Sequence, residues 1–248
     1  MESLETELER ARELSVAELA DAIESIGFEC TRCGACCKAN DPPEGEEGTK
    51  EPHTATVFPD EVRELQGAAE ETFDEEYDWR DAARPMPYGV SEGEAGPEGE
   101  TFEWALQTDA CGDCAFYEEG ESRSDSERSS DDEPRDGGTG ACTVHDSRPL
   151  VCQTYPFSVA LGGTNEPMGE AVDREGLVRA HECEGLGRDI SREEAEELAE
   201  ALKRRAIREL EEAIDLRNEY EPRPDVEGVV VHDSEGAKRP DGTSLDRR

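Results

Sequence analysis

The sequence predicts an α+β fold in which a small, irregular, cysteine-rich core with short antiparallel strands is flanked by N-terminal and C-terminal helices. Three observations support this prediction. Amphipathic helical patterns lie near both ends of the chain, short segments typical of strands lie between them, and all nine cysteines fall in that middle part. Only 33% of the 248 residues are hydrophobic and 5% are aromatic, so any apolar core must be small.

Two helices are expected in residues 1–27. Apolar residues recur at intervals of four and three over residues 4–11, which is the spacing of one helix face. The second helix begins after Ser15, where Ser15 and Glu18 have the form of a capping box. Gly27 ends it, because glycine readily adopts the positive φ that follows many helices.

The middle of the chain, residues 28–187, is predicted to be a cysteine-cluster domain. Alternating or β-branched apolar residues predict short strands at residues 54–58, 102–106 and 157–161. We expect a helix at 59–65, mostly irregular chain at 66–100, a hairpin between 114–117 and 141–144, and a strand at 176–181 paired with 157–161.

Three further segments complete the predicted organisation. Residues 118–140 are almost free of apolar side chains, so we expect a disordered acidic insertion. A long helix is expected over 188–218, opened by a capping box at Ser191 and Glu194. We expect a flexible tail over 219–248, with Val229–Val231 as its only strand candidate.

The charge of the chain limits the classes of partner. There are 65 acidic and 26 basic residues, which gives a formal net charge of −39. A protein that follows nucleic-acid phosphates needs a basic face, so that class is excluded. Self-repulsion of this size weakens a compact fold in dilute salt, but in molar salt the screening length falls to about 3 Å. We therefore interpret the acidity as adaptation to a salty, halophile-like cytosol.

Membrane and export functions are also not expected. No apolar run approaches the roughly 18 residues that span a bilayer. The first residues, Met1–Glu5, are acidic, whereas a signal peptide begins with basic residues before an apolar centre. We therefore expect a cytoplasmic protein.

The strongest chemical signal is the run Cys-Thr-Arg-Cys-Gly-Ala-Cys-Cys at residues 30–37. Thiols in C-x2-C spacing on a tight turn converge on one metal centre, and Gly34 permits such a turn. Thiolate is a soft, charged donor that suits zinc or iron. Disulfides, buried free thiols and a redox dithiol are the alternatives, but a reducing cytosol and the density of the cluster favour metal ligation. The other cysteines are Cys111, Cys114, Cys142, Cys152 and Cys183.

The cysteine pattern as a whole resembles a known family. The residues that carry the resemblance are Phe28-x-Cys30-x-x-Cys33-Gly34-x-Cys36-Cys37, Cys114-x-Phe116, Cys142-x5-Arg148-Pro149-x-x-Cys152-x-x-Tyr155-Pro156-Phe157 and Cys183-x-Gly185. Over roughly residues 26–187 the chain resembles the CxxCxxCC cysteine-cluster family, described as zinc- or iron-chelating and often as iron–sulfur proteins. The resemblance implies eight metal ligands: Cys30, Cys33, Cys36, Cys37, Cys114, Cys142, Cys152 and Cys183. Cys111 lies outside the pattern, and Gln153 and His145 replace residue types that are common in the family.

Eight thiolates exceed the four ligands of one tetrahedral zinc. They suit two zinc sites, one [4Fe–4S] cluster plus a zinc, or one cluster plus structural thiols. Because adjacent side chains tend to point apart, Cys36 and Cys37 are expected to serve different centres or different sides of one cluster. Arg32 and Arg148 are candidates to offset thiolate charge. His145 and His181 are candidate ligands, but a solvated or supporting position is the simpler expectation for both.

Three functional hypotheses follow. The leading one is a cytosolic protein that holds zinc or an iron–sulfur cluster, with a metal ion as its partner. The second is an iron–sulfur-dependent enzyme for redox chemistry or methyl transfer, suggested by resemblance to flagellin lysine methylases. No cofactor loop and no Ser/His/Asp set supports that alternative. The third is a scaffold that delivers metal or presents a surface to a protein partner.

Overall fold

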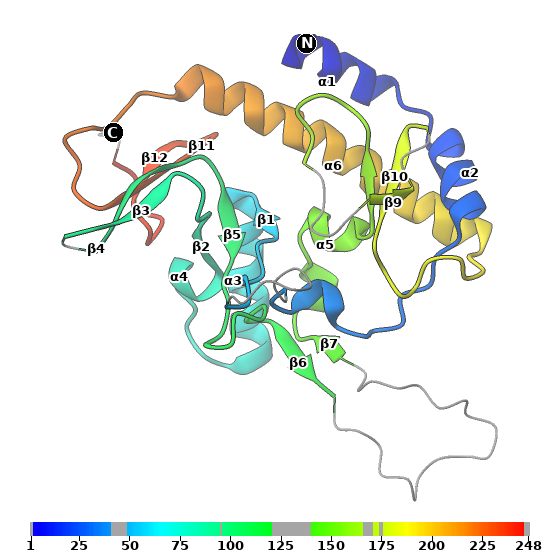
Figure 1. Ribbon diagram of the computed structural model, residues 1–248, viewed down its shortest axis with the longest axis horizontal. Helices are drawn as coiled ribbons and strands as arrows, with labels where there is room; N and C mark the ends of the chain where they lie inside the picture. Colours follow the sequence, from blue (N-terminus) through cyan, green and yellow to red (C-terminus); the bar gives the residue numbers. More distant parts are fainter. Residues whose placement is uncertain are drawn as a thin grey trace, which may run out of the picture.

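The structure is a computed structural model that describes residues 2–40, 49–94, 96–120, 140–165, 171–173 and 176–245. It confirms the predicted α+β fold, with two helices at the N-terminal end, a long helix over residues 192–219 and short, mainly antiparallel strands before and after that helix (Figure 1). Most of the predicted acidic insertion, residues 121–139, lies outside the described residues. Within the described chain, no helix is both long and apolar enough to cross a bilayer.

The two N-terminal helices pack against the long helix that precedes the C-terminal strands. The helices α1 (Leu4–Glu13) and α2 (Val16–Ile26) lie against the 28-residue helix α6 (Arg192–Glu219) (Figure 1). The predicted caps are present, because the Ser15 and Ser191 hydroxyls each accept a backbone N–H from the third residue of their helix. The apolar faces meet in the helical core, the buried side chains around Leu19, Ile23, Phe157, Leu202 and Leu210.

A three-stranded sheet completes the helical core. Its strand order is β8 (Phe157–Val159), β10 (Val178–His181) and β9 (Ala171–Asp173), with antiparallel pairing. Ala180 lies opposite Phe157 in the register, which confirms the predicted pairing of these two segments. Both side chains are fully buried, so the sheet turns its apolar face toward α6.

A second core lies under another small sheet. The strands β1 (Thr56–Val57), β5 (Trp104–Leu106) and β2 (Ala83–Pro85) pair in the order β1-β5-β2. Two helices, α3 (Pro59–Phe73) and α4 (Trp79–Ala82), belong to the same region. The tryptophan core is the set of buried side chains around Val62, Leu65, Trp79, Trp104 and Phe116. Its two indole rings meet edge to face, with centroids 5.0 Å apart.

The expectation that residues 66–100 are mostly irregular is wrong. The helix α3 continues to Phe73, and β3 (Val90–Gly93) and β4 (Gly96–Thr101) follow. The strand β4 reads Gly-Pro-Glu-Gly-Glu-Thr, a sequence with weak strand propensity. It is nevertheless a strand because β3 pairs with one edge and the distant β11 (Val229–Asp233) with the other.

The expectation of a flexible tail over 219–248 is wrong for residues 229–245. The strands β11 and β12 (Gly236–Lys238) form a hairpin that completes the sheet β12-β11-β4-β3. Val231, from the one predicted strand segment, is fully buried. Asp233 anchors the hairpin, since it accepts the Trp104 indole N–H at 2.8 Å and the Lys238 ammonium at 2.6 Å. Residues 229–238 are therefore ordered by the local hairpin and by the long-range pairing of β11 with β4.

Arg205 links α6 to the chain segment that contains Thr154 and Phe157. It lies in α6, is only 2% exposed and pairs with Glu209 at 2.7 Å. Its guanidinium also donates to the Thr154 hydroxyl at 3.0 Å and to the Phe157 carbonyl at 3.2 Å. Thr154 ends the short helix α5 (Leu150–Thr154), which contains Cys152. The buried arginine therefore fixes a cysteine-bearing helix to the helical core.

Candidate metal centre

The first four cysteines of the candidate centre lie on a loop, residues 28–40, that contains one short 3-10 turn at Ala35–Cys37. Gly34 begins this turn with φ +76°, a conformation that favours glycine. A Cβ added at Gly34 would lie 2.3 Å from the Tyr117 hydroxyl oxygen. The predicted role of Gly34 in a tight turn is confirmed, and the absence of a side chain also admits the tyrosine ring.

Backbone hydrogen bonds tie this loop to the hairpin of β6 (Tyr117–Glu119) and β7 (Gly140–Cys142). The Cys114 N–H donates to the Cys37 carbonyl at 2.7 Å, just before β6. The Gly140 N–H, at the start of β7, donates to the Arg32 carbonyl at 2.7 Å. Two remote cysteine segments thus adjoin the first one, and the predicted hairpin between them is present.

The segment that carries Cys183 adjoins the start of the same loop. Phe28 and Leu186 form an antiparallel bridge, and the Glu29 N–H donates to the Gly185 carbonyl at 3.0 Å. Both apolar side chains pack on the helical core. Cys183 and the first loop cysteines are therefore held together from the helical side of the molecule.

Four cysteines contact the tryptophan core: Cys37, Cys114, Cys142 and Cys152. Cys152 is positioned through α5, whose Leu150 N–H donates to a carboxylate oxygen of Glu61 at 2.8 Å. The other Glu61 oxygen accepts the Phe58 N–H at 3.0 Å at the start of α3. Glu61 thus links the start of α3 to a helix 89 residues further along the chain, and no local sequence pattern indicates this second partner.

Three thiols accept a backbone N–H from the residue two positions further along the chain: Cys114, Cys142 and Cys183. At Cys183 the Gly185 nitrogen lies 3.4 Å from Sγ. These bonds favour the negatively charged thiolate, so each lowers the pKa of its thiol. Hydrogen bonds to sulfur are also a means by which proteins tune metal–thiolate centres.

The vicinal pair differs from expectation. The Sγ atoms of Cys36 and Cys37 lie 3.8 Å apart, so the two side chains turn toward each other rather than apart. The 3-10 turn that contains both residues brings their side chains to one side. For zinc–sulfur bonds of about 2.3 Å, a tetrahedron has sulfur–sulfur edges of about 3.8 Å. The pair therefore already has a spacing that is compatible with metal ligation.

Burial and the closeness of other thiols raise the pKa of five cysteines and so favour their protonated form: Cys36, Cys114, Cys142, Cys152 and Cys183. Burial raises the pKa of Cys114 to about 12 and also raises that of Cys152. The hydrogen bond to Cys37, followed by burial, raises the pKa of Cys36. The Arg148 charge works in the opposite direction on Cys36, as predicted for this arginine. A bound cation would reverse the effect of crowding, because it stabilises several adjacent thiolates at once.

The structure brings the cysteine segments together without closing a coordination shell. Among the described residues, no three Cys, His, Asp or Glu side chains lie in an arrangement that already holds an ion. The donor type, the vicinal spacing and the N–H···S bonds fit a metal–thiolate centre, whereas the full ligand set requires side-chain movement. The eight-cysteine ligand set therefore stays a prediction.

The secondary candidates lie elsewhere. Cys111 is exposed on a turn in which the Asp109 carboxylate accepts its N–H at 2.8 Å. His145 is exposed beside Asp146. His181 is 1% exposed, and its Nε2 lies 3.1 Å from the Ser158 hydroxyl. Neither histidine needs a metal to account for its position.

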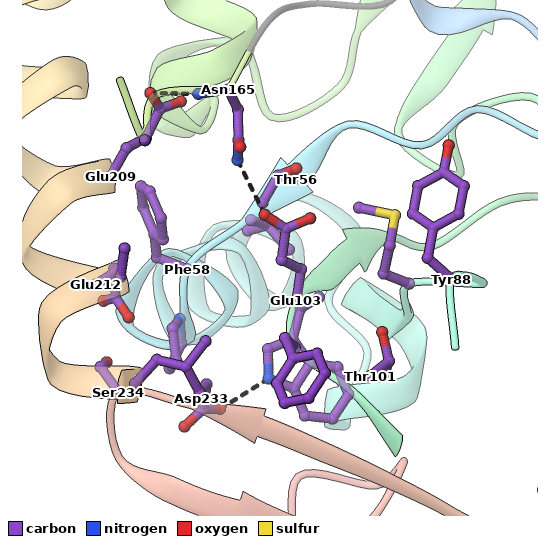
Figure 2. A pocket seen from close by; sticks show the side chains of 18 residues that line it. Thr56, Phe58, Tyr88, Thr101, Glu103, Asn165, Glu209, Glu212, Asp233 and Ser234 are labelled. Atoms are coloured by element: carbon purple, nitrogen blue, oxygen red, sulfur yellow. Dashed lines mark hydrogen bonds between the residues drawn. The ribbon is translucent and has the colours of Figure 1, made fainter. Parts of the chain in front are cut away.

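A cavity of about 280 Å³ lies between α6, β1, β5 and the residues that follow β11 (Figure 2). Figure 2 shows Glu103 near its centre, where it accepts the Asn165 side-chain amide at 3.0 Å. Burial raises the pKa of Glu103. None of the 18 residues that line the cavity is a cysteine, so it is separate from the candidate metal centre.

Comparison with known proteins identifies the cysteine pattern. No curated protein and no solved structure matches the chain. The model of the CxxCxxCC family, described as "Putative zinc- or iron-chelating domain", matches residues 29–184. This match spans more than half of the chain and contains all nine cysteines. The chain therefore belongs to the CxxCxxCC family.

Proposed function

We propose that this protein binds zinc or iron, as single ions or as an iron–sulfur cluster, through eight cysteine thiolates: Cys30, Cys33, Cys36, Cys37, Cys114, Cys142, Cys152 and Cys183. One observation carries the proposal. A single loop, residues 28–40, makes backbone hydrogen bonds to Cys114, Gly140 and Gly185, which lie in three remote segments that each contain or border a further cysteine of the pattern. The family description supports the same conclusion.

The chain contributes ligands, their orientation and compensating charge. A bound metal would supply the positive charge that stabilises closely spaced thiolates. The N–H groups of Phe116, Val144 and Gly185 donate to three of the sulfurs and so favour their thiolate form, against the opposite effect of burial. Arg148 adds positive charge near Cys36 and Cys142. Gly34 allows the loop that carries four of the cysteines to turn beside Tyr117.

The test is anaerobic purification of the full chain, followed by elemental analysis, a sulfide assay and a visible spectrum. Brown protein with iron and acid-labile sulfide indicates a cluster, whereas colourless protein with zinc indicates a zinc site. Either result supports the proposal.

The control is Cys111→Ser, which removes an exposed thiol outside the pattern and is expected to keep the full metal content. Cys37→Ser is expected to lower it. Metal-free protein in which all nine thiols react freely in the native state would refute the proposal. No observation on the described residues favours the enzymatic alternative, so it is not proposed.

A further inference from the structure

The cavity of about 280 Å³ has an acidic and aromatic lining. Of the described residues that line it, four are Asp or Glu and none is Lys, Arg or His. We infer that the cavity binds a small organic cation, whose ammonium group pairs with Glu103 and whose apolar part lies among the aromatic side chains. This binding is separate from the proposed metal centre, because no cysteine lines the cavity.

The four carboxylates of the cavity differ in whether a basic side chain neutralises them. Three of them have ion pairs within the protein: Glu209 with Arg205 at 2.7 Å, Asp233 with Lys238 at 2.6 Å, and Glu212 with Arg208. Glu103 has no ion pair among the described residues, where the neutral Asn165 amide is its hydrogen-bond partner. A carboxylate withdrawn from water is stabilised by a positive charge beside it. Glu103 is therefore the carboxylate to which a ligand can bring that charge.

The position of Glu103 makes its charge available to a molecule in the cavity. Figure 2 shows Glu103 near the centre of the lining side chains, with Phe58 and Tyr88 on opposite sides of it. Asn165 donates to one carboxylate oxygen at 3.0 Å, so the other oxygen can accept a hydrogen bond from an ammonium group. Burial raises the pKa of Glu103, and burial followed by the Glu103 charge raises that of Glu209. A bound cation would oppose both shifts.

Aromatic rings surround this carboxylate. The rings of Phe58, Tyr88, Phe102 and Trp104 all line the cavity. Tyr88 is 71% exposed and Phe102 is 45% exposed, so these two rings lie at the open side, whereas Trp104 is 1% exposed. The face of an aromatic ring attracts a cation, and its apolar surface packs against carbon. A carboxylate among such rings suits an ammonium group that is attached to an apolar group.

The same lining does not suit a metal ion. Hard cations such as calcium take about six to eight oxygen ligands. In the part of the chain that the structure describes, no group of three Asp, Glu, His or Cys side chains is placed to hold an ion. The size of the cavity also favours an organic molecule, since an apolar cavity of about 150 Å³ already holds benzene. The ligand class is therefore a small alkyl- or arylammonium ion.

Calorimetric titration of the full chain, as purified, tests this inference with benzylamine as the probe. Benzyl alcohol serves as the neutral analogue of similar size. The titration is made in about 1 M NaCl, where the screening length is about 3 Å, because a net charge of −39 attracts every cation in dilute salt. We expect one benzylammonium ion to bind per chain. Benzyl alcohol should bind at least about tenfold more weakly, since it lacks the charged hydrogen bond to Glu103.

Two matched variants locate the site. Glu103→Gln removes the charge but keeps a carbonyl oxygen that can accept the Asn165 amide. It is expected to bind benzylammonium and benzyl alcohol about equally. Glu64→Gln removes the same charge at an exposed position of α3 outside the cavity, and it should keep the preference of the wild type. Circular dichroism checks that both variants are folded.

A second measurement needs only the unmodified chain, in case Glu103→Gln does not fold. The chain has two tryptophans, of which Trp104 lines the cavity and Trp79 does not. Bound benzylammonium should therefore shift the indole N–H signal of Trp104 in the NMR spectrum more than that of Trp79. A shift of neither signal at saturation would place the bound probe outside the cavity and overturn the inference.

The remaining outcomes are equally decisive. The inference is wrong if benzylammonium, butylammonium and cyclohexylammonium all fail to bind below about 10 mM. Equal affinity of the wild type for benzylammonium and benzyl alcohol also overturns it, as does an unchanged preference in folded Glu103→Gln protein. Loss of the preference in Glu103→Gln and its retention in Glu64→Gln support it. None of these readouts measures metal, so a failure here is distinct from a failure of the metal-binding proposal.

Discussion

The two cores of this protein differ in the structure that surrounds them. The helical core is enclosed by the three capped amphipathic helices α1, α2 and α6, of which α6 alone has 28 residues. The tryptophan core is enclosed by the 15-residue helix α3 together with strands of two to five residues, the short helices α4 and α5 and irregular loops. Four cysteines lie at the edge of the tryptophan core and none is part of the helical core.

This difference indicates two sources of stability. Apolar burial and helix caps suffice for a bundle of helices, where most residues contribute a backbone hydrogen bond and each turn places one or two apolar side chains on the buried face. Loops supply few such contacts, so their ordering needs cross-links between distant segments. In this chain, those cross-links are backbone hydrogen bonds to the loop 28–40 and, by our proposal, thiolate–metal bonds.

Metal removal should therefore affect the two cores unequally, and this is the largest effect we expect. Structural zinc contributes about 10–16 kcal/mol in small zinc domains. After anaerobic chelation, hydrogen exchange followed by mass spectrometry should show faster exchange over residues 28–40 and 111–117. The α6 amides should stay protected, and renewed metal should restore the loop.

Equal loss of protection in α6 and in the loop would contradict this view, because it would show that both cores unfold as one unit. The buried Arg205 makes this a demanding test, since it binds α6 to α5 directly. Unchanged protection everywhere would show that the loop does not depend on metal.

A substitution in the helical core should lower the free energy of unfolding and leave the metal content unchanged. Leu202 in α6 is 1% exposed, so Leu202→Ala leaves a cavity and is expected to cost about 2–5 kcal/mol of unfolding free energy. Metal content per folded chain should not change. The matched control is Leu177→Ala, at a residue that is 39% exposed, with an expected cost below about 0.5 kcal/mol. Denaturant unfolding measures the free energy of unfolding, and elemental analysis measures the metal content. Metal loss from folded Leu202→Ala protein would contradict the separation of the cores.

The same contrast explains which features the sequence predicts. The helices α2 and α6 follow from local signals, because apolar spacing and the serine caps act within a few residues. The strand β4 could not be predicted, since its glycine- and charge-rich sequence becomes a strand between the partners β3 and β11. Its pairing with β11 joins residues more than 100 positions apart, and single-sequence patterns do not report such contacts.

The same distinction between local and long-range signals applies to the candidate metal centre. Cysteine spacing indicates which residues are ligand candidates, because close spacing of thiols in sequence is a local property. The supporting residues Glu61, Tyr117 and Arg205 act through contacts with remote segments, and no local pattern marks them. The orientation of Cys36 and Cys37 was wrongly predicted, since it depends on the 3-10 turn after Gly34.

Two glycine substitutions give the smallest expected effects and sharpen the contrast between loop and helix. Gly34→Ala forces a left-handed residue to carry a Cβ that meets the Tyr117 ring, so we expect a loss of about 2 kcal/mol and a lower metal content. Gly67→Ala, in the exposed middle of α3 with no atom within 4 Å of the new Cβ, should instead gain about 0.5–1 kcal/mol. Denaturant unfolding of the metal-loaded proteins measures both. A Gly34→Ala variant as stable as wild type would show that the loop does not depend on the left-handed conformation at Gly34. The cysteine spacing alone would then have to position the thiols.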